Sequence, residues 1–117
     1  IDFIGFVGDD KDLVLMGHDV FVLPSFYPTE AQPISIIEAM SFGLPIITTR
    51  FNFLEELVSE ESGELVAIRD SYQIELALLR LLDNSVFGRC SMFNTDKAYD
   101  EFTVEQHIKK IQLAMNT

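Results

Sequence analysis

The chain has 117 residues, which supports one domain, and 48% of them are hydrophobic, enough for a packed core rather than a disordered tail. Its 8 basic and 19 acidic residues leave a net charge of −11, which repels nucleic acid and anionic lipid at long range, so neither is an expected partner. The same field opposes any anionic ligand, which would need local dipoles or basic residues from elsewhere to hold it.

The sequence carries no signal for membrane insertion or secretion. No apolar run approaches the ~18 residues of a membrane helix, and no secretory signal peptide is recognisable. The single cysteine, Cys90, cannot form an internal disulfide and is expected as a buried small residue in a helix, which is compatible with a reducing compartment. Because the chain opens at Ile1 inside an apolar run, we expect it to be a piece of a longer protein.

Two apolar runs in the first part of the chain predict strands. The first, residues 1–7, reads IDFIGFV. The second, residues 19–23, reads DVFVL, and such a nearly continuous run is typical of a strand covered on both faces. Pro24 and Ser25 end it, and residues 26–32 form the loop beyond its carboxyl end.

Between these strands the sequence predicts a short helix over residues 11–17. Asp9 or Asp10 is placed to cap its first turn. We expect three of its apolar side chains to face inward: Leu13, Val14 and Met16. His18 follows the helix end, where a surface or capping role is expected.

Residues 29–45 (TEAQPISIIEAMSFGLP) predict the crossover of a β-loop-α-β unit. Pro33 suits the first position of a helix, because its missing N–H would be unpaired there. Gly43 suits the left-handed position just past a helix end, and Pro45 prevents continuation. We therefore predict a helix over residues 33–42.

Two glutamates flank the start of this helix, Glu30 just before it and Glu38 one turn in. The backbone N–H groups of Ile34 and Ser35 have no partner within the helix and, with the helix dipole, favour a phosphate. A carboxylate on either side can accept hydrogen bonds from hydroxyl groups. A nucleotide sugar presents sugar hydroxyls, a diphosphate and ribose hydroxyls in that order, which fits this arrangement.

The next part of the chain predicts two more strands around a short helix. Ile46–Thr49 (IITT) is a strand, followed by Arg50 as a surface residue or a phosphate contact. Residues 54–59 predict the helix, and residues 63–67 (GELVA) the last strand. Four acids are expected on a solvated face: Glu55, Glu56, Glu60 and Glu61.

From Ser71 the apolar period becomes helical. Ser71 is expected to cap an amphipathic helix, whose apolar side is made by Ile74, Leu76, Ala77, Leu78, Leu81 and Leu82. Residues 85–98 predict a second, less regular helix. Thr103 is placed to cap a final helix with Gln106 at the capping-box position, and His107 is expected at the edge of its apolar face.

Several motifs are absent from the sequence. No G-x-G-x-x-G follows a strand and no G-K-[ST] occurs, so neither a dinucleotide fold nor a P-loop is supported. No second histidine or acid cluster joins His107 to make a metal-ligand set. We therefore expect no cofactor and no metal.

Three features together resemble the donor-binding half of glycosyltransferase family 4, the group 1 retaining enzymes of the GT-B fold. They are DVFVLPS, the E-x7-E spacing of Glu30 and Glu38, and EAMSFGLPIITT. The resemblance runs from FIGFVGDDKDL through Gly63–Val66 to the C-terminal helices. It implies an α/β fold over residues 1–117: a Rossmann-like parallel sheet of order 3-2-1-4-5-6, truncated to its last four strands, with C-terminal helices.

The resemblance also implies the ligand and the site. The donor would be a nucleotide diphosphate sugar, most readily a UDP sugar, with Glu30 facing the sugar as the catalytic residue and Glu38 holding the ribose. Backbone N–H groups between them would hold the diphosphate. The implied donor-binding residues are Glu30, Ala31, Gln32, Pro33, Ile34, Ser35 and Glu38. Ala31 stands where the family often has glycine, Asn52 and Phe53 replace a frequent glycine pair, and nothing matches the family's diphosphate-binding Arg and Lys.

The remaining expectations concern the whole enzyme. The resemblance implies an acceptor domain that precedes this chain, a polysaccharide or lipid-linked acceptor, and a cytoplasmic enzyme that can be peripheral at the inner membrane face. Alone, the chain is expected to be inactive and to cover its open sheet edge, either by docking residues 1–7 beside residues 19–23 or by exchanging strands between chains. Two alternatives stay open: a GT-B nucleotide-sugar epimerase, and a non-catalytic α/β interaction domain in which Glu30 and Glu38 are surface residues.

Overall fold

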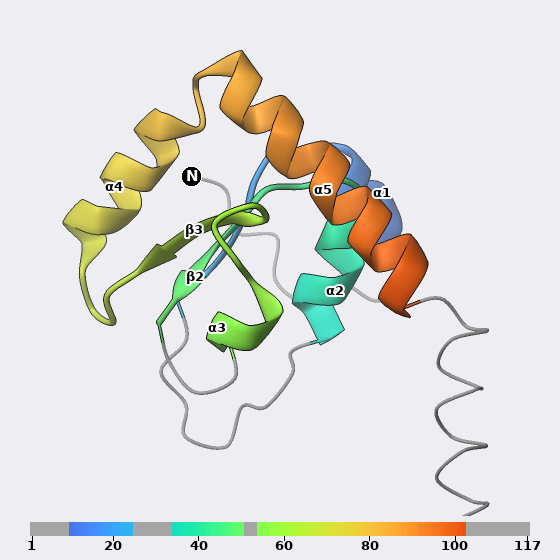
Figure 1. Cartoon of the computed structure of the whole chain (residues 1–117), viewed down its shortest axis with the longest axis horizontal. Helices are drawn as coiled ribbons and strands as arrows, with labels where there is room; N and C mark the ends of the chain where they lie inside the picture. The colour runs from blue at the N-terminus through green and yellow to red at the C-terminus, as the bar shows by residue number, and fades with distance from the viewer. Residues whose placement is uncertain (1–9, 25–33, 51–53, 103–117) are drawn as a thin grey trace, which may run out of the picture.

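The described part of the chain alternates helices and strands, as predicted for an α/β fold. A computed structural model describes residues 10–24, 34–50 and 54–102. Its elements are, in chain order, α1 (Lys11–Met16), β1 (Phe21–Leu23), α2 (Ile34–Ser41), β2 (Ile46–Thr49), α3 (Leu54–Leu57), β3 (Gly63–Val66), α4 (Ser71–Arg80) and α5 (Asn84–Phe102) (Figure 1). The predicted strand over residues 1–7 and the predicted final helix lie outside the described residues.

The three strands form one parallel sheet in the order β1-β2-β3. Phe21 lies opposite Ile46, which in turn lies opposite Gly63. The hydroxyl of Thr48 donates to the carbonyl of Leu23 at 2.7 Å and fixes the carboxyl end of β1 to β2. Each crossover between strands carries a helix, α2 and then α3. This order is the one predicted for the last three strands of the sheet.

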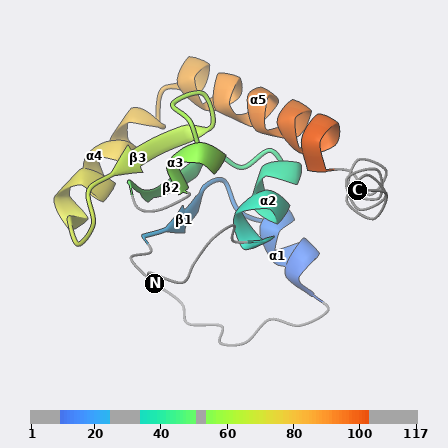
Figure 2. The ribbon, with the colours of Figure 1, turned by 60° about the horizontal axis from the view of Figure 1, so that its bottom comes forward.

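Strand β2 is the centre of the core, because all four of its residues are buried. Successive side chains of a strand point to opposite faces, so Ile46 packs against α2 and α3 while Ile47 packs against α4 and the start of α5. Helices therefore cover both faces of the sheet. Figure 2 shows α5 continuing from the end of α4 and passing above α2.

The core consists of two clusters, one on each face of the sheet. The larger contains Ile36, Ala39, Met40, Leu44, Ile46, Leu54, Leu57, Val58 and Ala98. The other contains Ile47, Val66, Ala77, Leu81 and Cys90. The prediction for Cys90 is confirmed, since it is a buried, free cysteine in α5.

Strand β1 differs from its prediction. It spans Phe21–Leu23 rather than residues 19–23, and Val22 is 38% exposed. The expected cover on both faces is therefore wrong. Among the described residues β1 pairs only with β2, so it is an edge strand and lacks the neighbours that bury β2.

Helix α1 has its predicted place, but its orientation was predicted wrongly. Of the three side chains predicted to face inward, Val14 is half-buried, but Leu13 and Met16 are 69% and 67% exposed. Leu15 packs against the larger cluster instead. Because α1 has six residues, fewer than two turns, it offers the core little surface. Asp10 makes no side-chain capping hydrogen bond, and Asp9, the other predicted cap, lies outside the described residues. His18 is exposed and its ring Nδ1–H donates to the carbonyl of Val14, which confirms the capping role.

The loop between β3 and α4 is closed by side-chain hydrogen bonds. Asp70, not Ser71 as predicted, caps α4, because its carboxylate accepts from the N–H of Gln73 at 3.0 Å. The side-chain oxygen of Gln73 accepts from the N–H of Ala67 at 2.7 Å. On α4, Ala77 and Leu81 are buried as predicted, whereas Leu78 and Leu82 are 42% and 75% exposed.

Helix α5 is a single helix of 19 residues that ties the amino-terminal loops of the sheet together. The side chain of Asn94 is fully buried, and its amide N–H groups donate to the carbonyls of Leu44 and Ser62, both at 2.8 Å. Leu44 precedes β2 and Ser62 precedes β3, so one side chain fixes two loops. The ammonium group of Lys97 donates to the carbonyl of Leu57 at 3.0 Å and holds the end of α3.

Candidate donor site

Helix α2 begins where the crossover prediction places it, one residue after Pro33. Ile34 and Ser35 are exposed at its first turn, which contains no acidic residue. Glu38 is half-buried in the second turn. The structure thus describes three of the predicted donor-binding residues, Ile34, Ser35 and Glu38. The other four, Glu30, Ala31, Gln32 and Pro33, lie outside the described residues.

The buried face of α2 determines where Glu38 lies. Ile36, Ala39 and Met40 are fully buried in the larger cluster. A helix advances about 100° per residue, which puts Glu38 on the opposite face and one turn behind Ile34. Helical side chains tilt toward the helix N-terminus, so the Glu38 side chain extends toward the exposed first turn. This is the side on which an anion would meet the N–H groups that have no partner within the helix.

The end of α2 is fixed by a glycine and by the packing of α5. Gly43 follows the helix with φ 75°, the left-handed conformation predicted for it. Its N–H donates to the carbonyl of Met40 at 2.9 Å, and the N–H of Leu44 donates to that of Ala39 at 3.1 Å. A Cβ at Gly43 would lie 2.9 Å from the hydroxyl of Ser91, because α5 crosses closely at this point. The position of Glu38 is therefore set by packing at the C-terminal end of α2.

The first turn of α2 shares one edge of the molecule with the carboxyl ends of the strands. In parallel strands these ends lie at the same edge, and α2 follows β1 there before returning to the start of β2. Arg50 extends β2 at this edge, and its N–H donates to the carbonyl of Val66 at 2.9 Å. Open α/β sheets bind ligands beyond this edge.

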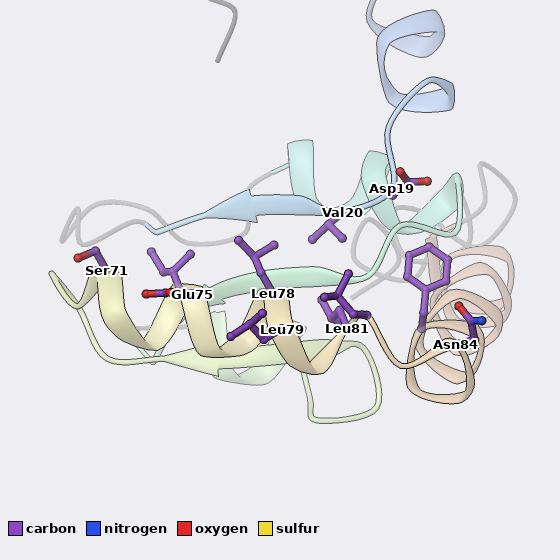
Figure 3. Close-up of a pocket in the computed structure, with 11 residues that line it drawn as sticks. Asp19, Val20, Ser71, Glu75, Leu78, Leu79, Leu81 and Asn84 are labelled. Atoms are coloured by element: carbon purple, nitrogen blue, oxygen red, sulfur yellow. The ribbon is translucent and has the colours of Figure 1, made fainter.

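A hollow lies away from the start of α2, between α4 and the residues just before β1 (Figure 3). It has a volume of about 660 Å³, and in Figure 3 Leu78 of α4 and Val20 point toward one another across it. Its lining is mostly apolar, with Asp19 and Glu75 at its borders. It contains none of the predicted donor-binding residues, so it is not the predicted site.

The described residues give no sign of metal or thiol chemistry. Within residues 10–24, 34–50 and 54–102, no three His, Cys, Asp or Glu side chains gather closely enough to hold a metal ion. Burial raises the pKa of the Cys90 thiol, with a smaller contribution from the charge of Glu64. A thiol of this kind is a packing residue rather than a nucleophile. In the same part of the chain, no helix combines the length and apolar composition needed to cross a bilayer.

Comparisons with known proteins identify the family of the chain. Residues 1–84 match the protein family described as glycosyl transferases group 1. The chain is 35% identical over 105 residues to UDP-Gal:alpha-D-GlcNAc-diphosphoundecaprenol alpha-1,3-galactosyltransferase of Escherichia coli, covering 89% of this chain and 27% of that protein. It is 30% identical over 101 residues to the amylovoran biosynthesis glycosyltransferase AmsK of Erwinia amylovora, covering 82% of this chain and 25% of that protein.

The fold has a close counterpart among solved structures. Sucrose-phosphate synthase from Thermosynechococcus elongatus superposes with a TM-score of 0.82 at 25% identity, over 98% of this chain and 29% of that one. The chain thus spans between 25% and 29% of the length of these three proteins. Since the family match covers most of the chain and the fold agrees with it, the chain belongs to the group 1 glycosyltransferases.

Proposed function

We propose that residues 1–117 form the donor-binding part of a retaining glycosyltransferase. The enzyme would transfer a sugar from a nucleotide diphosphate sugar to a polysaccharide or lipid-linked acceptor. The observation that carries the proposal is the start of α2: an exposed first turn at the carboxyl edge of a parallel sheet, with Glu38 one turn behind it.

The first turn of α2 would hold the diphosphate. The N–H groups of Ile34 and Ser35 have no partner within the helix, and the helix dipole adds about half a positive charge at this end. A chain of net charge −11 repels anions elsewhere, so this local dipole matters more here than in a neutral protein. As the sugar leaves, charge develops on the diphosphate, and fixed N–H groups stabilise it without reorganisation.

The two glutamates would bind the hydroxyl groups on either side of the diphosphate. Glu38 would accept from the ribose, since a half-buried carboxylate makes stronger hydrogen bonds than an exposed one. Glu30 would face the donor sugar and act as the catalytic residue, with Ala31, Gln32 and Pro33 completing the segment. In this arrangement the donor would be held by hydrogen bonds.

The name of one relative supports a choice of donor and acceptor. The E. coli relative is named for UDP-Gal as donor and for an acceptor carried on diphosphoundecaprenol. A UDP sugar and a lipid-linked acceptor are therefore the substrates we propose for this chain, in a cytoplasmic enzyme peripheral at the inner membrane face. The acceptor domain would lie outside these 117 residues, so the chain alone would bind donor without turning it over.

The proposal is tested by titrating UDP into the chain and into the Glu38→Ala variant by isothermal calorimetry. We expect the substitution to weaken UDP binding about tenfold, because hydrogen bonds to a charged group contribute about 1.5–3 kcal/mol. Glu75→Ala is the matched control, since Glu75 is an exposed mid-helix glutamate on α4. Its affinity for UDP should equal that of the wild type.

Two results would contradict this proposal, in whole or in part. Failure of the wild-type chain to bind UDP would favour a non-catalytic domain. Equal affinity of the wild type and the Glu38→Ala variant would take Glu38 out of the ribose site.

A further inference from the structure

Three buried oxygen atoms lie where the turn before β3 meets α5, and none has a hydrogen-bond partner within the described part of the chain. They are the hydroxyl oxygens of Ser59 and Ser62 and the side-chain oxygen of Asn94. Ser62 and Asn94 are 0% exposed, and the hydroxyl of Ser59 is buried although the residue as a whole is only half-buried. Polar groups buried in this way cost free energy unless they are hydrogen-bonded, so each of these oxygens requires a partner.

Direct hydrogen bonds place the three residues side by side. The side-chain N–H of Asn94 donates to the carbonyl of Ser62 at 2.8 Å. The backbone N–H of Ser62 in turn donates to the carbonyl of Ser59 at 3.0 Å. Each residue thus contacts the next, and the three buried oxygens belong to one polar site rather than to three separate places.

The orientation of the Asn94 amide is fixed by its two N–H groups. One donates to the carbonyl of Ser62 and the other to that of Leu44, both at 2.8 Å. Turning the amide over would bring its oxygen against two carbonyl oxygens, which cannot donate. The oxygen of Asn94 can only accept a hydrogen bond, whereas each serine hydroxyl carries a proton to donate.

A single water molecule matches this set of groups. It can donate one proton to the oxygen of Asn94 and accept from the hydroxyls of Ser59 and Ser62. That makes three hydrogen bonds, the number typical of a buried water. All three protein atoms are neutral oxygens, so a cation at this position would have no carboxylate ligand to balance its charge.

A hollow of about 570 Å³ lies beside the polar site, between the turn and α5. Glu60 and Glu61 line it from the turn, and Phe93 lines it from α5. These three residues are direct chain neighbours of the residues that carry the buried oxygens. The turn and α5 are therefore separated next to the polar site, which provides a route by which water can enter.

We propose that Ser59, Ser62 and Asn94 form a water-binding site that joins α5 to the turn before β3. The water adds a bridge to the direct bond between Asn94 and Ser62, and such a bridge is enthalpically nearly as good as a direct hydrogen bond. Because Ser62 precedes β3, the site lies at the amino edge of the sheet, opposite the start of α2. The inference therefore does not depend on donor binding.

The direction of the stability change on removing one hydroxyl tests the proposal in urea denaturation. Ser59→Ala and Ser62→Ala each remove a partner of the water, so each should raise the unfolding equilibrium constant about three- to tenfold. If the hydroxyls had no partner, each substitution would remove an unpaired buried group and lower that constant instead. Ser71→Ala is the control, because Ser71 is exposed in the first turn of α4 and its loss should not destabilise the chain. Increased stability of the Ser59→Ala and Ser62→Ala variants would overturn the proposal.

A shared water also couples the two serines energetically. The double variant Ser59→Ala, Ser62→Ala should lose less stability than the sum of the two single losses, because the first substitution already weakens the binding of the water. Strictly additive losses would contradict a single water shared by both hydroxyls.

A crystal structure of the 117-residue chain gives the direct observation. We expect one ordered water within hydrogen-bond distance of the hydroxyl of Ser62 and the side-chain oxygen of Asn94. The melting temperature should be the same in sodium chloride and in choline chloride, since no cation occupies the site. Buried oxygens that meet no ordered water would overturn the proposal. So would a rise in melting temperature with sodium that the Ser62→Ala variant lacks.

Discussion

Gly43 combines two requirements that only a glycine meets. Its φ of 75° lies in the left-handed region, and its Cα faces α5 so closely that a Cβ would lie 2.9 Å from the Ser91 hydroxyl and 3.0 Å from that of Thr95. The first requirement could be predicted from the sequence, because Gly43 precedes Pro45 after an apolar helix. The second could not, because it depends on α5, which lies some 50 residues further along the chain.

We expect Gly43→Ala to destabilise the chain by about 1–3 kcal/mol, the sum of the left-handed strain and the contact with α5. Removing both hydroxyls in a Gly43→Ala, Ser91→Ala, Thr95→Ala variant should recover the steric part of that loss. Urea denaturation provides the measurement. The matched control is Gly88→Ala in α5, whose Cβ would meet nothing within 4 Å and which should stabilise the helix by about 0.5–1 kcal/mol. A Gly43→Ala variant as stable as the wild type would contradict this account of the α2–α5 contact.

At the scale of the element, α2 and β2 were predicted well and β1 and α1 less well. The ends of α2 are marked locally, by Pro33 before it and Gly43 after it, so its range was correct within a residue. The predicted and observed ranges of β2 are the same. All four of its residues are buried, and a strand buried on both faces has a continuous run of apolar or hydroxyl-bearing residues, which is easy to recognise in the sequence. These are cases in which local pattern and tertiary environment agree.

Strand β1 and helix α1 show the opposite case. Their apolar runs predicted cover on both faces and three inward side chains, but Val22, Leu13 and Met16 are exposed. The hydrophobic pattern shows which side chains could be buried. Whether they are buried depends on neighbouring segments that the local pattern does not specify. The candidate site likewise has features that local sequence predicts and features that depend on tertiary packing. The helix start and Glu38 could be derived from spacing, whereas the half-burial of Glu38 depends on neighbours that spacing does not specify.

Helix α5 gives a pH prediction. Asp83 caps it: the carboxylate accepts from the hydroxyl of Ser85 at 2.7 Å and from the N–H groups of Ser85 and Val86 at 2.9 and 3.4 Å. The Ser85 side-chain bond, then the two backbone bonds, hold the pKa of Asp83 below its ordinary value. Because the pKa of Asp83 is lower in the folded than in the unfolded chain, the ionised carboxylate stabilises the fold at any pH above the unfolded-state pKa. This stabilisation is lost as the pH falls through the folded-state pKa.

We therefore expect Asp83→Ala to lower the melting temperature at pH 7 and to have a smaller effect when both proteins are measured near pH 2. Asp83→Asn keeps an acceptor but cannot titrate, so its melting temperature relative to Asp83→Ala should be independent of pH. A difference between wild type and Asp83→Ala that stays constant from pH 7 to pH 2 would show that the carboxylate charge does not act at this cap.

At the scale of the whole molecule, β1 lies at the edge of the described sheet and pairs there with β2 on one side. Phe21 donates its N–H to the carbonyl of Pro45 on the β2 side, and in a parallel strand the next residue, Val22, points its N–H the other way. An uncovered strand edge invites pairing. The sequence predicted that residues 1–7 dock there or that chains exchange strands, and those residues lie outside the described part.

Hydrogen exchange of the Val22 amide, measured alongside light scattering, tests that prediction. We expect the amide to be protected, because either arrangement supplies a carbonyl partner. Protection in a monomer would mean that residues 1–7 dock on β1, and protection in an oligomer would mean strand exchange. An unprotected Val22 amide in a clean monomer would contradict both.

At the scale of the whole molecule, the proposed donor site uses only a few residues of the described fold. The chain spans about a quarter of the length of the relatives it matches, yet the start of α2 and its surrounding strand ends are all present. Under the proposed function, the chain alone would bind a nucleotide, while catalysis would require the rest of the enzyme. It also makes donor binding, rather than turnover, the appropriate measurement on these 117 residues.

The most direct test is a UDP titration followed by NMR of the labelled backbone amides. If the first turn of α2 holds the diphosphate, the largest shifts on UDP addition will be those of the Ile34 and Ser35 amides, and inorganic pyrophosphate will move the same two signals. Saturable UDP binding that leaves both amides unshifted and perturbs α4 or α5 instead would contradict the donor site described here.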